Sequence, residues 1–173
     1  MNRWNELPTG QMPPTTITVV VEATKHSRNT YDVNGAYIKL DKILHPKIMY
    51  PLDYGYIPKT KWEDGEPMEA LVLAEYPTCP GCLVDAHPIG ILKTTEKGMT
   101  KGMLIVIGAK DPQYPAIDDV EKVQKNILKE VEDFFKEKSA SEKITIKIIG
   151  WAGAKEAQRA VVHAMKIYDQ KKD

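Results

Sequence analysis

Apolar residues in the first two thirds of the chain are grouped in short runs, several of them rich in Val and Ile. Such runs predict β-strands, because β-branched side chains pack well on a pleated surface. The strands predicted in this way are Thr16–Ala23, Ala36–Leu40, Ala70–Leu73, Cys82–Thr94 and Met103–Ile107. The Asn34-Gly35 turn is consistent with a hairpin that leads into the second strand, and Pro88 and Gly90 predict a bend in the fourth.

Three other stretches of this region do not fit a central strand. Residues 1–15 are polar and contain Pro8, Gly10, Pro13 and Pro14, which predicts an extended N-terminal arm lying on the rest of the protein. Residues 25–29 form a polar loop. Tyr50–Ile57 is aromatic but is interrupted by Pro51 and Gly55, so we expect it not to be a central strand.

From Asp118 onward the apolar residues follow a helical spacing instead. Asp118 and Asp119 are typical N-cap residues for a helix that begins there. Ile144–Ile149 alternates like a strand, and a second amphipathic helix follows Gly150. Several strands followed by two helices predict an α+β fold, with a closed or strongly curved sheet.

Composition limits the class of protein further. A chain of 173 residues is long enough for one domain with its own core, which predicts a single domain over 1–173. The 24 basic and 24 acidic residues balance, which argues against a nucleic-acid or membrane partner. Because residues 1–14 lack the apolar core of a signal peptide and no stretch suits a membrane span, we expect a cytoplasmic protein.

Cys79 and Cys82 lie too close together in the sequence for a disulfide between them to link distant parts of the fold. A redox pair or half of a zinc site is an alternative, but packing or chance is favoured because no second cysteine pair exists.

Three carboxylates lie within six residues immediately before the predicted strand Ala70–Leu73: Asp64, Glu66 and Glu69. Carboxylates crowded in this way must share a cation or face water, because like charges repel. The spacing alone favours a solvated acidic turn, and a divalent-metal site is the alternative.

The chain resembles the soluble type I inorganic pyrophosphatases in segments that keep the family's order and spacing. The segments are VVVEATKHSRNTYD, IKLDK, YPLDYGYIP, EDGEPMEALVL, PGCLVDAHPIGILK, DPQY, DFFKEK and IIGWAGAKEA. The resemblance implies a small five-stranded OB-like β-barrel with two flanking α-helices, usually in a homo-oligomer. It also implies Mg²⁺-dependent hydrolysis of diphosphate, in which metal ions hold the substrate and generate a hydroxide nucleophile.

The resemblance also assigns roles to residues. It implies that the metal ligands are Glu22, Asp64, Glu69 and Glu96. It implies that the catalytic groups are Glu66, at the general-base position, and Tyr54. The implied phosphate-binding groups are Lys42, Tyr50, Lys101 and Lys138.

The chain departs from the family pattern at several of these positions. The family has aspartates where this chain has the longer Glu66, Glu69 and Glu96, and a metal-bridging aspartate where it has Lys101. Among the phosphate-binding positions, the family has lysines where this chain has Thr30, Met103 and Ser139. It has a tyrosine in place of Lys138 and an arginine in place of Lys42. A longer ligand displaces its oxygens, and Mg²⁺ requires near-ideal geometry. An ammonium among the ligands repels the cations that the site should collect.

The departures predict that diphosphate hydrolysis is lost, strongly weakened or redirected to another phosphate compound. A silent protein would serve as a subunit or binding module, assembled with an active homologue. A redirected enzyme would hold one metal with its remaining acids and bind a phosphate through Lys42, Lys101 and Lys138, with His87 or Glu66 as base. The alternative is an active Mg²⁺-dependent inorganic diphosphatase.

Overall fold

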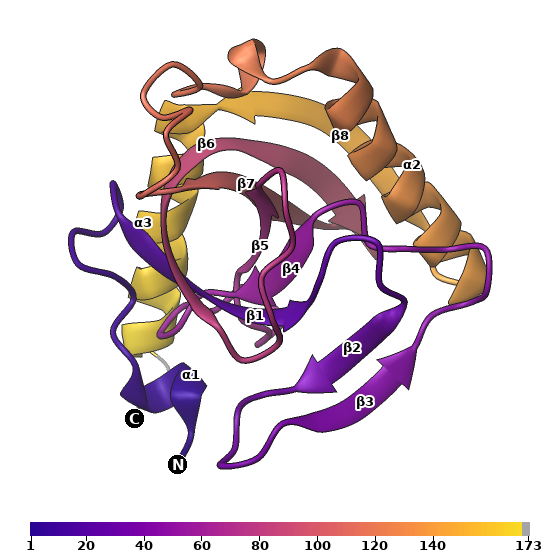
Figure 1. Ribbon diagram of the computed structural model, residues 1–173, viewed down its shortest axis with the longest axis horizontal. Coiled ribbons are helices and arrows are strands. Elements are labelled where there is room, and N and C mark those ends of the chain that lie inside the picture. The colour runs from indigo at the N-terminus through magenta and orange to yellow at the C-terminus, as the bar shows by residue number, and fades with distance from the viewer. Residues whose placement is uncertain (171–173) are drawn as a thin grey trace.

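Strand β1 (Ile17–Ala23) lies where the sheet closes on itself. In the computed structural model, which describes residues 1–170, β1 pairs with β4 (Asp53–Tyr56) on one side and with β6 (Leu83–Glu96) on the other. From β4 the sheet continues through β5 (Glu69–Leu73) and β7 (Met99–Gly108) back to β6, so these five strands form a ring (Figure 1). The predicted five-stranded barrel is confirmed.

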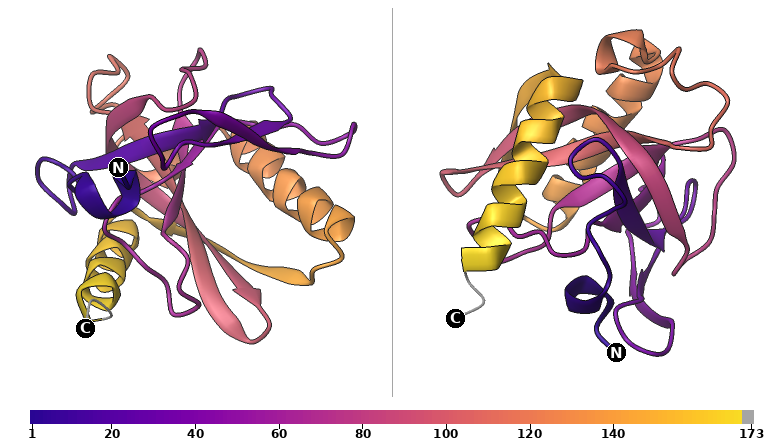
Figure 2. Two further views of the ribbon diagram at one scale, coloured as in Figure 1. Left: turned by 90° about the horizontal axis from the view of Figure 1, so that it is seen from below. Right: turned by 90° about the vertical axis from the view of Figure 1, so that its left-hand side faces the viewer.

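Strand pairs around the ring are antiparallel except for β5 and β7, which are parallel. Strand β8 (Ile146–Gly153) adds to the outer side of β6 and extends the sheet beyond the ring. Figure 2 shows that β6 and β7 project together as a long hairpin. A bulge between Pro88 and Gly90 bends β6, as the sequence predicts.

Helices α2 (Lys125–Ser141) and α3 (Ala154–Gln170) cover the sheet on opposite sides (Figure 1). On β5, Leu71 and Leu73 belong to the core cluster under α2. The intervening Val72 belongs to the cluster under α3. Successive strand residues point to opposite faces, so a strand buried on both faces is apolar at nearly every position. Neither helix is long and apolar enough to cross a membrane, and no other helix within residues 1–170 is.

The N-terminal arm is folded at its start, which the sequence analysis missed. Residues Arg3–Glu6 form the short helix α1, and the side chain of Asn2 caps it by accepting a hydrogen bond from the Asn5 amide. The Trp4 indole donates to the Thr60 carbonyl at 2.9 Å. The arm therefore lies on the body of the protein, as expected, but it is not extended throughout.

A second, two-stranded sheet of β2 (Asn29–Asp32) and β3 (Lys39–Ile43) stands beside the ring (Figure 1). The hairpin is confirmed, but its second strand begins later than the predicted Ala36. The connecting turn is longer because Asn34 is held by α1: its side-chain oxygen accepts a hydrogen bond from the Trp4 amide at 2.8 Å.

The predicted start of the first long helix at Asp118 is wrong. Asp119 caps a short 3₁₀ turn, η1 (Val120–Lys122), and its second carboxylate oxygen accepts a hydrogen bond from the Ala154 amide at 2.9 Å. Because Asp119 is bound to the start of α3, the chain turns again and α2 begins only at Lys125.

The expectation that Tyr50–Ile57 holds no central strand is also wrong. Pro51 precedes β4 and does not interrupt it, and Gly55 lies where β1 approaches closely. A Cβ atom at Gly55 would stand 2.0 Å from the Val20 carbonyl oxygen. Glycine is therefore a requirement of this strand pair and not a break in the strand.

We predict that Gly55→Ala destabilises the protein by about 3 kcal/mol or more, or prevents folding, because the added methyl group meets rigid backbone. Gly35→Ala is the matched control, since a Cβ there has no atom within 4 Å. We expect the control to leave stability unchanged or raise it by about 0.5 kcal/mol. Urea unfolding of the two variants measures both effects. Equal stabilities would contradict the close approach of β1 and β4.

Candidate functional site

A cleft of about 170 Å³ lies between the sheet and the C-terminal end of α2. Its charged lining residues are Glu66, Glu69, Glu96, Lys101, Lys138 and Glu142. A larger hollow of about 290 Å³, lined by residues such as Leu52 and Ile127, contains none of the predicted site residues. The cleft is therefore the candidate site.

The acidic turn is shaped by its own backbone. The side chain of Asp64 accepts a hydrogen bond from the Glu66 amide at 3.1 Å, and Gly65 adopts a positive φ of 92°. The Trp62 amide donates to the Glu66 carbonyl at 2.8 Å and closes the turn. This geometry leads directly into β5, whose first residue is Glu69.

The parallel pairing of β5 with β7 places Glu69 opposite Met103. Residues two apart on a strand share a face, so Lys101 lies on the same face as Met103. Met103 is 5% exposed and forms part of the cleft lining. An apolar side chain thus occupies a position beside the half-buried carboxylate of Glu69.

Lys101 forms an ion pair with Asp64, and both side chains are largely shielded from solvent. Burial acts to lower the pKa of Lys101, but the bond to Asp64 outweighs it. The charges of Glu69 and Glu96 act in the same direction as Asp64, so the pKa of Lys101 lies above its ordinary value. An ammonium ion therefore sits among three of the predicted metal ligands.

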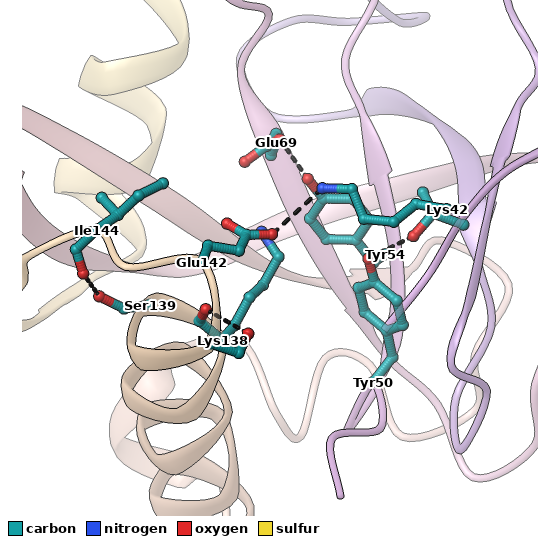
Figure 3. Close-up of polar contacts among 10 residues, drawn as sticks. Lys42, Tyr50, Tyr54, Glu69, Lys138, Ser139, Glu142 and Ile144 are labelled. Carbon is teal, nitrogen blue, oxygen red and sulfur yellow. Dashed lines mark hydrogen bonds and ion pairs between the residues drawn. The ribbon is translucent and has the colours of Figure 1, made fainter. Parts of the chain in front are cut away.

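The hydroxyl of Tyr54 donates a hydrogen bond to the carboxylate of Glu69 (Figure 3). Burial raises the pKa of Glu69, although Tyr54 and two lysines oppose the shift. Burial, together with the neighbouring Glu69 and Glu22, raises the pKa of Tyr54 well above its ordinary value. Tyr54 therefore keeps its proton and acts as a donor.

Tyr50 lies behind Tyr54, with ring centroids 5.2 Å apart. Its hydroxyl and that of Thr30 are 2.7 Å apart and share a hydrogen bond. Burial raises the pKa of Tyr50 to about 12. Thr30 therefore supplies a neutral partner where the resemblance implies a lysine.

Glu142 joins two of the predicted phosphate-binding lysines (Figure 3). Its Oε1 atom is 3.2 Å from Nζ of Lys42 and 3.7 Å from Nζ of Lys138. Glu142 is not among the predicted site residues, although its i,i+4 spacing from Lys138 at the end of α2 is a sequence signal for such a pair. The neighbouring Ser139 is structural, since its hydroxyl donates to the Ile144 carbonyl and accepts from the Ile146 amide.

Two predicted metal ligands are absent from the cleft lining: Asp64, which pairs with the lining residue Lys101, and Glu22. Burial is the largest cause that raises the pKa of Glu22 to about 8, and the charges of Glu69, Asp32 and Asp41 add to it. Asp32 and Asp41 are not among the predicted site residues. The hairpin of β2 and β3 brings them near Glu22.

Carboxylate oxygens are the ligands that Mg²⁺ prefers, so the chemistry of Asp64, Glu69 and Glu96 fits this ion. Among residues 1–170, however, no three carboxylate, imidazole or thiol side chains are grouped closely enough to hold a metal ion. Asp64 is bound to Lys101 and Glu69 to Tyr54. Metal binding would have to exchange these internal partners for the ion.

His87 does not line the cleft, contrary to expectation. Its ring stacks on Tyr114 with centroids 4.0 Å apart, and Nδ1 lies 2.9 Å from the Thr15 carbonyl oxygen. The bulged strand β6 carries His87 toward the N-terminal arm, whereas Glu96, at the other end of the strand, reaches the cleft.

Comparison with known proteins matches residues 19–169 to the family model described as inorganic pyrophosphatase. The chain is 34% identical to an inorganic pyrophosphatase of Haloferax volcanii, over 98% of each protein. It is also 34% identical to one of Picrophilus torridus, over 97% of this chain and 96% of that one. The crystal structure of the Thermus thermophilus inorganic pyrophosphatase matches with a TM-score of 0.89 at 31% identity, covering 98% of this chain and 99% of that one.

The raised pKa of Glu22 predicts a pH-dependent stability in metal-free buffer. Between pH 4.5 and about pH 8 the folded protein keeps the Glu22 proton while the unfolded chain releases it, so rising pH favours unfolding. We expect Glu22→Gln to remove this contribution, about 3–5 kcal/mol across the window. Urea unfolding with a chelator present, at several pH values, measures it. Parallel pH profiles for wild type and variant would contradict the burial of Glu22.

Proposed function

Since the chain belongs to the inorganic pyrophosphatase family, we propose that its cleft hydrolyses diphosphate to two phosphates in the presence of Mg²⁺. The observation that carries the proposal is the meeting of carboxylates (Glu66, Glu69 and Glu96) and lysines (Lys101 and Lys138) in one cleft. Such a mixed set suits a substrate with concentrated negative charge that binds together with cations.

Asp64, Glu69 and Glu96 are the residues that would hold Mg²⁺. When bound, the ion neutralises phosphate charge and lowers the pKa of a bound water. The chain's own part is to bind and orient the diphosphate and to move protons. Glu66, which is exposed at the turn, would accept the proton of the attacking water.

Lys42 and Lys138 supply the phosphate contacts. In the structure both ammonium groups are held by Glu142. A diphosphate oxygen that replaces this carboxylate would gain two charge-assisted hydrogen bonds. Tyr54 keeps its proton and donates a further hydrogen bond at the cleft. Substrate binding in this proposal is an exchange of partners and needs no new charged group.

The ion pair between Lys101 and Asp64 favours a second candidate. Here diphosphate hydrolysis is lost, strongly weakened or redirected to another phosphate compound, because a fixed ammonium competes with the metal for Asp64. Met103 adds no charge beside Glu69, which weakens the hold on a phosphate further. Assembly with an active homologue belongs to this candidate, whereas a homo-oligomer and a cytoplasmic location are predicted under both.

The first measurement is diphosphate hydrolysis by the purified protein with excess Mg²⁺. Under the first proposal we expect turnover that falls by about 10²–10³-fold in Glu69→Ala, because a carboxylate proposed to hold Mg²⁺ in the cleft is lost. Glu137→Gln, an exposed position outside the cleft lining, is the control and keeps wild-type activity.

The double variant Lys101→Asp, Met103→Lys distinguishes the two candidates. Absence of wild-type turnover, together with a gain in the double variant, would support the second candidate and reject the first. Turnover of other phosphate anhydrides or esters by the wild type would identify a redirected enzyme.

Metal affinity gives a test that does not depend on catalysis. We expect Lys101→Gln to bind Mg²⁺ about tenfold more tightly than wild type, because Asp64 is released and a nearby positive charge is removed. Lys129→Gln is the matched control, since Lys129 also pairs with an aspartate, Asp133, but lies outside the cleft. Isothermal titration calorimetry measures both. Equal affinities in the three proteins would show that Lys101 does not compete with the metal.

A further inference from the structure

Cys79 and Cys82, the only cysteines of the chain, stand at the two ends of a tight turn. The Cys82 amide donates to the Cys79 carbonyl at 3.1 Å, and the two central residues are Pro80 and Gly81. Gly81 has a φ of 83°, which is the conformation that a type II turn requires at its third residue. Proline at the second position is also typical of this turn.

The turn brings the two thiols together. The first and last Cα atoms of a β-turn lie within about 7 Å, and a disulfide needs a separation of about 4.4–6.8 Å. The Cys82 thiol donates a weak hydrogen bond to the Leu83 carbonyl at 4.0 Å, so it is not tied to a buried partner and can rotate toward Cys79. Both cysteines are free, and Cys79 is exposed. The expectation that packing explains the pair does not fit an exposed thiol.

The surrounding backbone holds this turn in place. The Gly81 amide donates to the Val21 carbonyl at 2.8 Å, and the Val21 amide donates to the Cys82 carbonyl at 3.0 Å. The guanidinium of Arg3 donates to the Gly81 carbonyl at 3.0 Å. A bond between the two sulfur atoms therefore needs side-chain rotation and little movement of the chain.

The preceding residue is anchored as well. Asp53, which is 1% exposed, accepts hydrogen bonds from the Thr78 amide at 2.8 Å and the Thr78 hydroxyl at 2.7 Å. Its other oxygen accepts from the Lys25 amide at 2.8 Å. The turn is thus fixed from both ends to strands of the ring.

We propose that Cys79 and Cys82 form a reversible dithiol–disulfide site that exchanges with small-molecule disulfides of the glutathione type. The Cys79 thiolate attacks one sulfur of the disulfide, forms a mixed disulfide and releases one thiolate. Cys82 then loses its proton to solvent and attacks the Cys79 sulfur, which releases the second thiolate. The two cysteines are oxidised by two electrons and the small disulfide is reduced to two thiols.

The order of attack follows from exposure. Cys79 is exposed and accessible to the oxidant, whereas Cys82 is partly buried. Burial, and then the neighbouring Cys79, raises the pKa of the Cys82 thiol. Cys82 therefore suits the second, intramolecular step, in which its partner sulfur is already beside it.

The test is equilibration of the full-length protein in buffers of reduced and oxidised glutathione, followed by intact-mass measurement. Ring closure lowers the mass by about 2 Da, because two hydrogen atoms leave, and both thiols are lost to a thiol reagent. Dithiothreitol should restore both thiols. A product that retains glutathione, or a covalent dimer, would overturn the proposal.

Two comparisons make the result specific. Cys79→Ser and Cys82→Ser each keep one thiol and cannot close the ring, so we expect only mixed disulfide. Wild type in denaturing urea has the same residues without the fixed turn. We expect the native protein to close the disulfide with an equilibrium constant at least about tenfold larger than the denatured chain, because the thiols are already positioned. An equal or smaller constant in the native protein would refute the site.

Discussion

The double pairing of β1, with β4 on one side and β6 on the other, is the constraint on which the rest of the structure depends. It closes five strands into a ring and so brings segments that are far apart in sequence to one cleft. The acidic turn precedes β5, Lys101 lies on β7, and Glu96 is the last residue of β6. Closure in turn requires the glycine of β4, because the backbones of β1 and β4 meet there without room for a side chain.

Within the cleft, charged and polar groups satisfy one another in the absence of any ligand. Lys101 neutralises Asp64, Tyr54 donates to Glu69, and Glu142 holds two lysines. No side-chain nitrogen or oxygen atom buried within residues 1–170 lacks a hydrogen-bond partner. A buried group without a partner is costly, so this internal pairing stabilises the free protein. The pairing also lowers the net binding free energy of a metal ion or phosphate. That free energy is the difference between the contacts that the ligand forms and the internal contacts that it replaces.

The sequence was sufficient to predict most strands, and five of the ten predicted site residues line one cleft. Strands β5 and β7 were predictable because their segments Ala70–Leu73 and Met103–Ile107 are buried on both faces and therefore apolar at every position. Strand β4 was missed because the need for Gly55 arises only from its contact with β1. The start of α2 was missed because Asp119 binds the Ala154 amide 35 residues away. Similarly, the Lys42–Glu142 and Lys101–Asp64 pairs join segments far apart in the sequence, so no local pattern predicts them.

Strand β4 connects the cleft with the thiol turn through two successive residues. Tyr54 points toward Glu69, whereas Asp53 points the opposite way and anchors the loop that carries Cys79. A disulfide in this turn would close a geometry that the hydrogen bonds of Val21 and Asp53 already impose. The cleft and the thiol turn therefore share strand β4 as a common support.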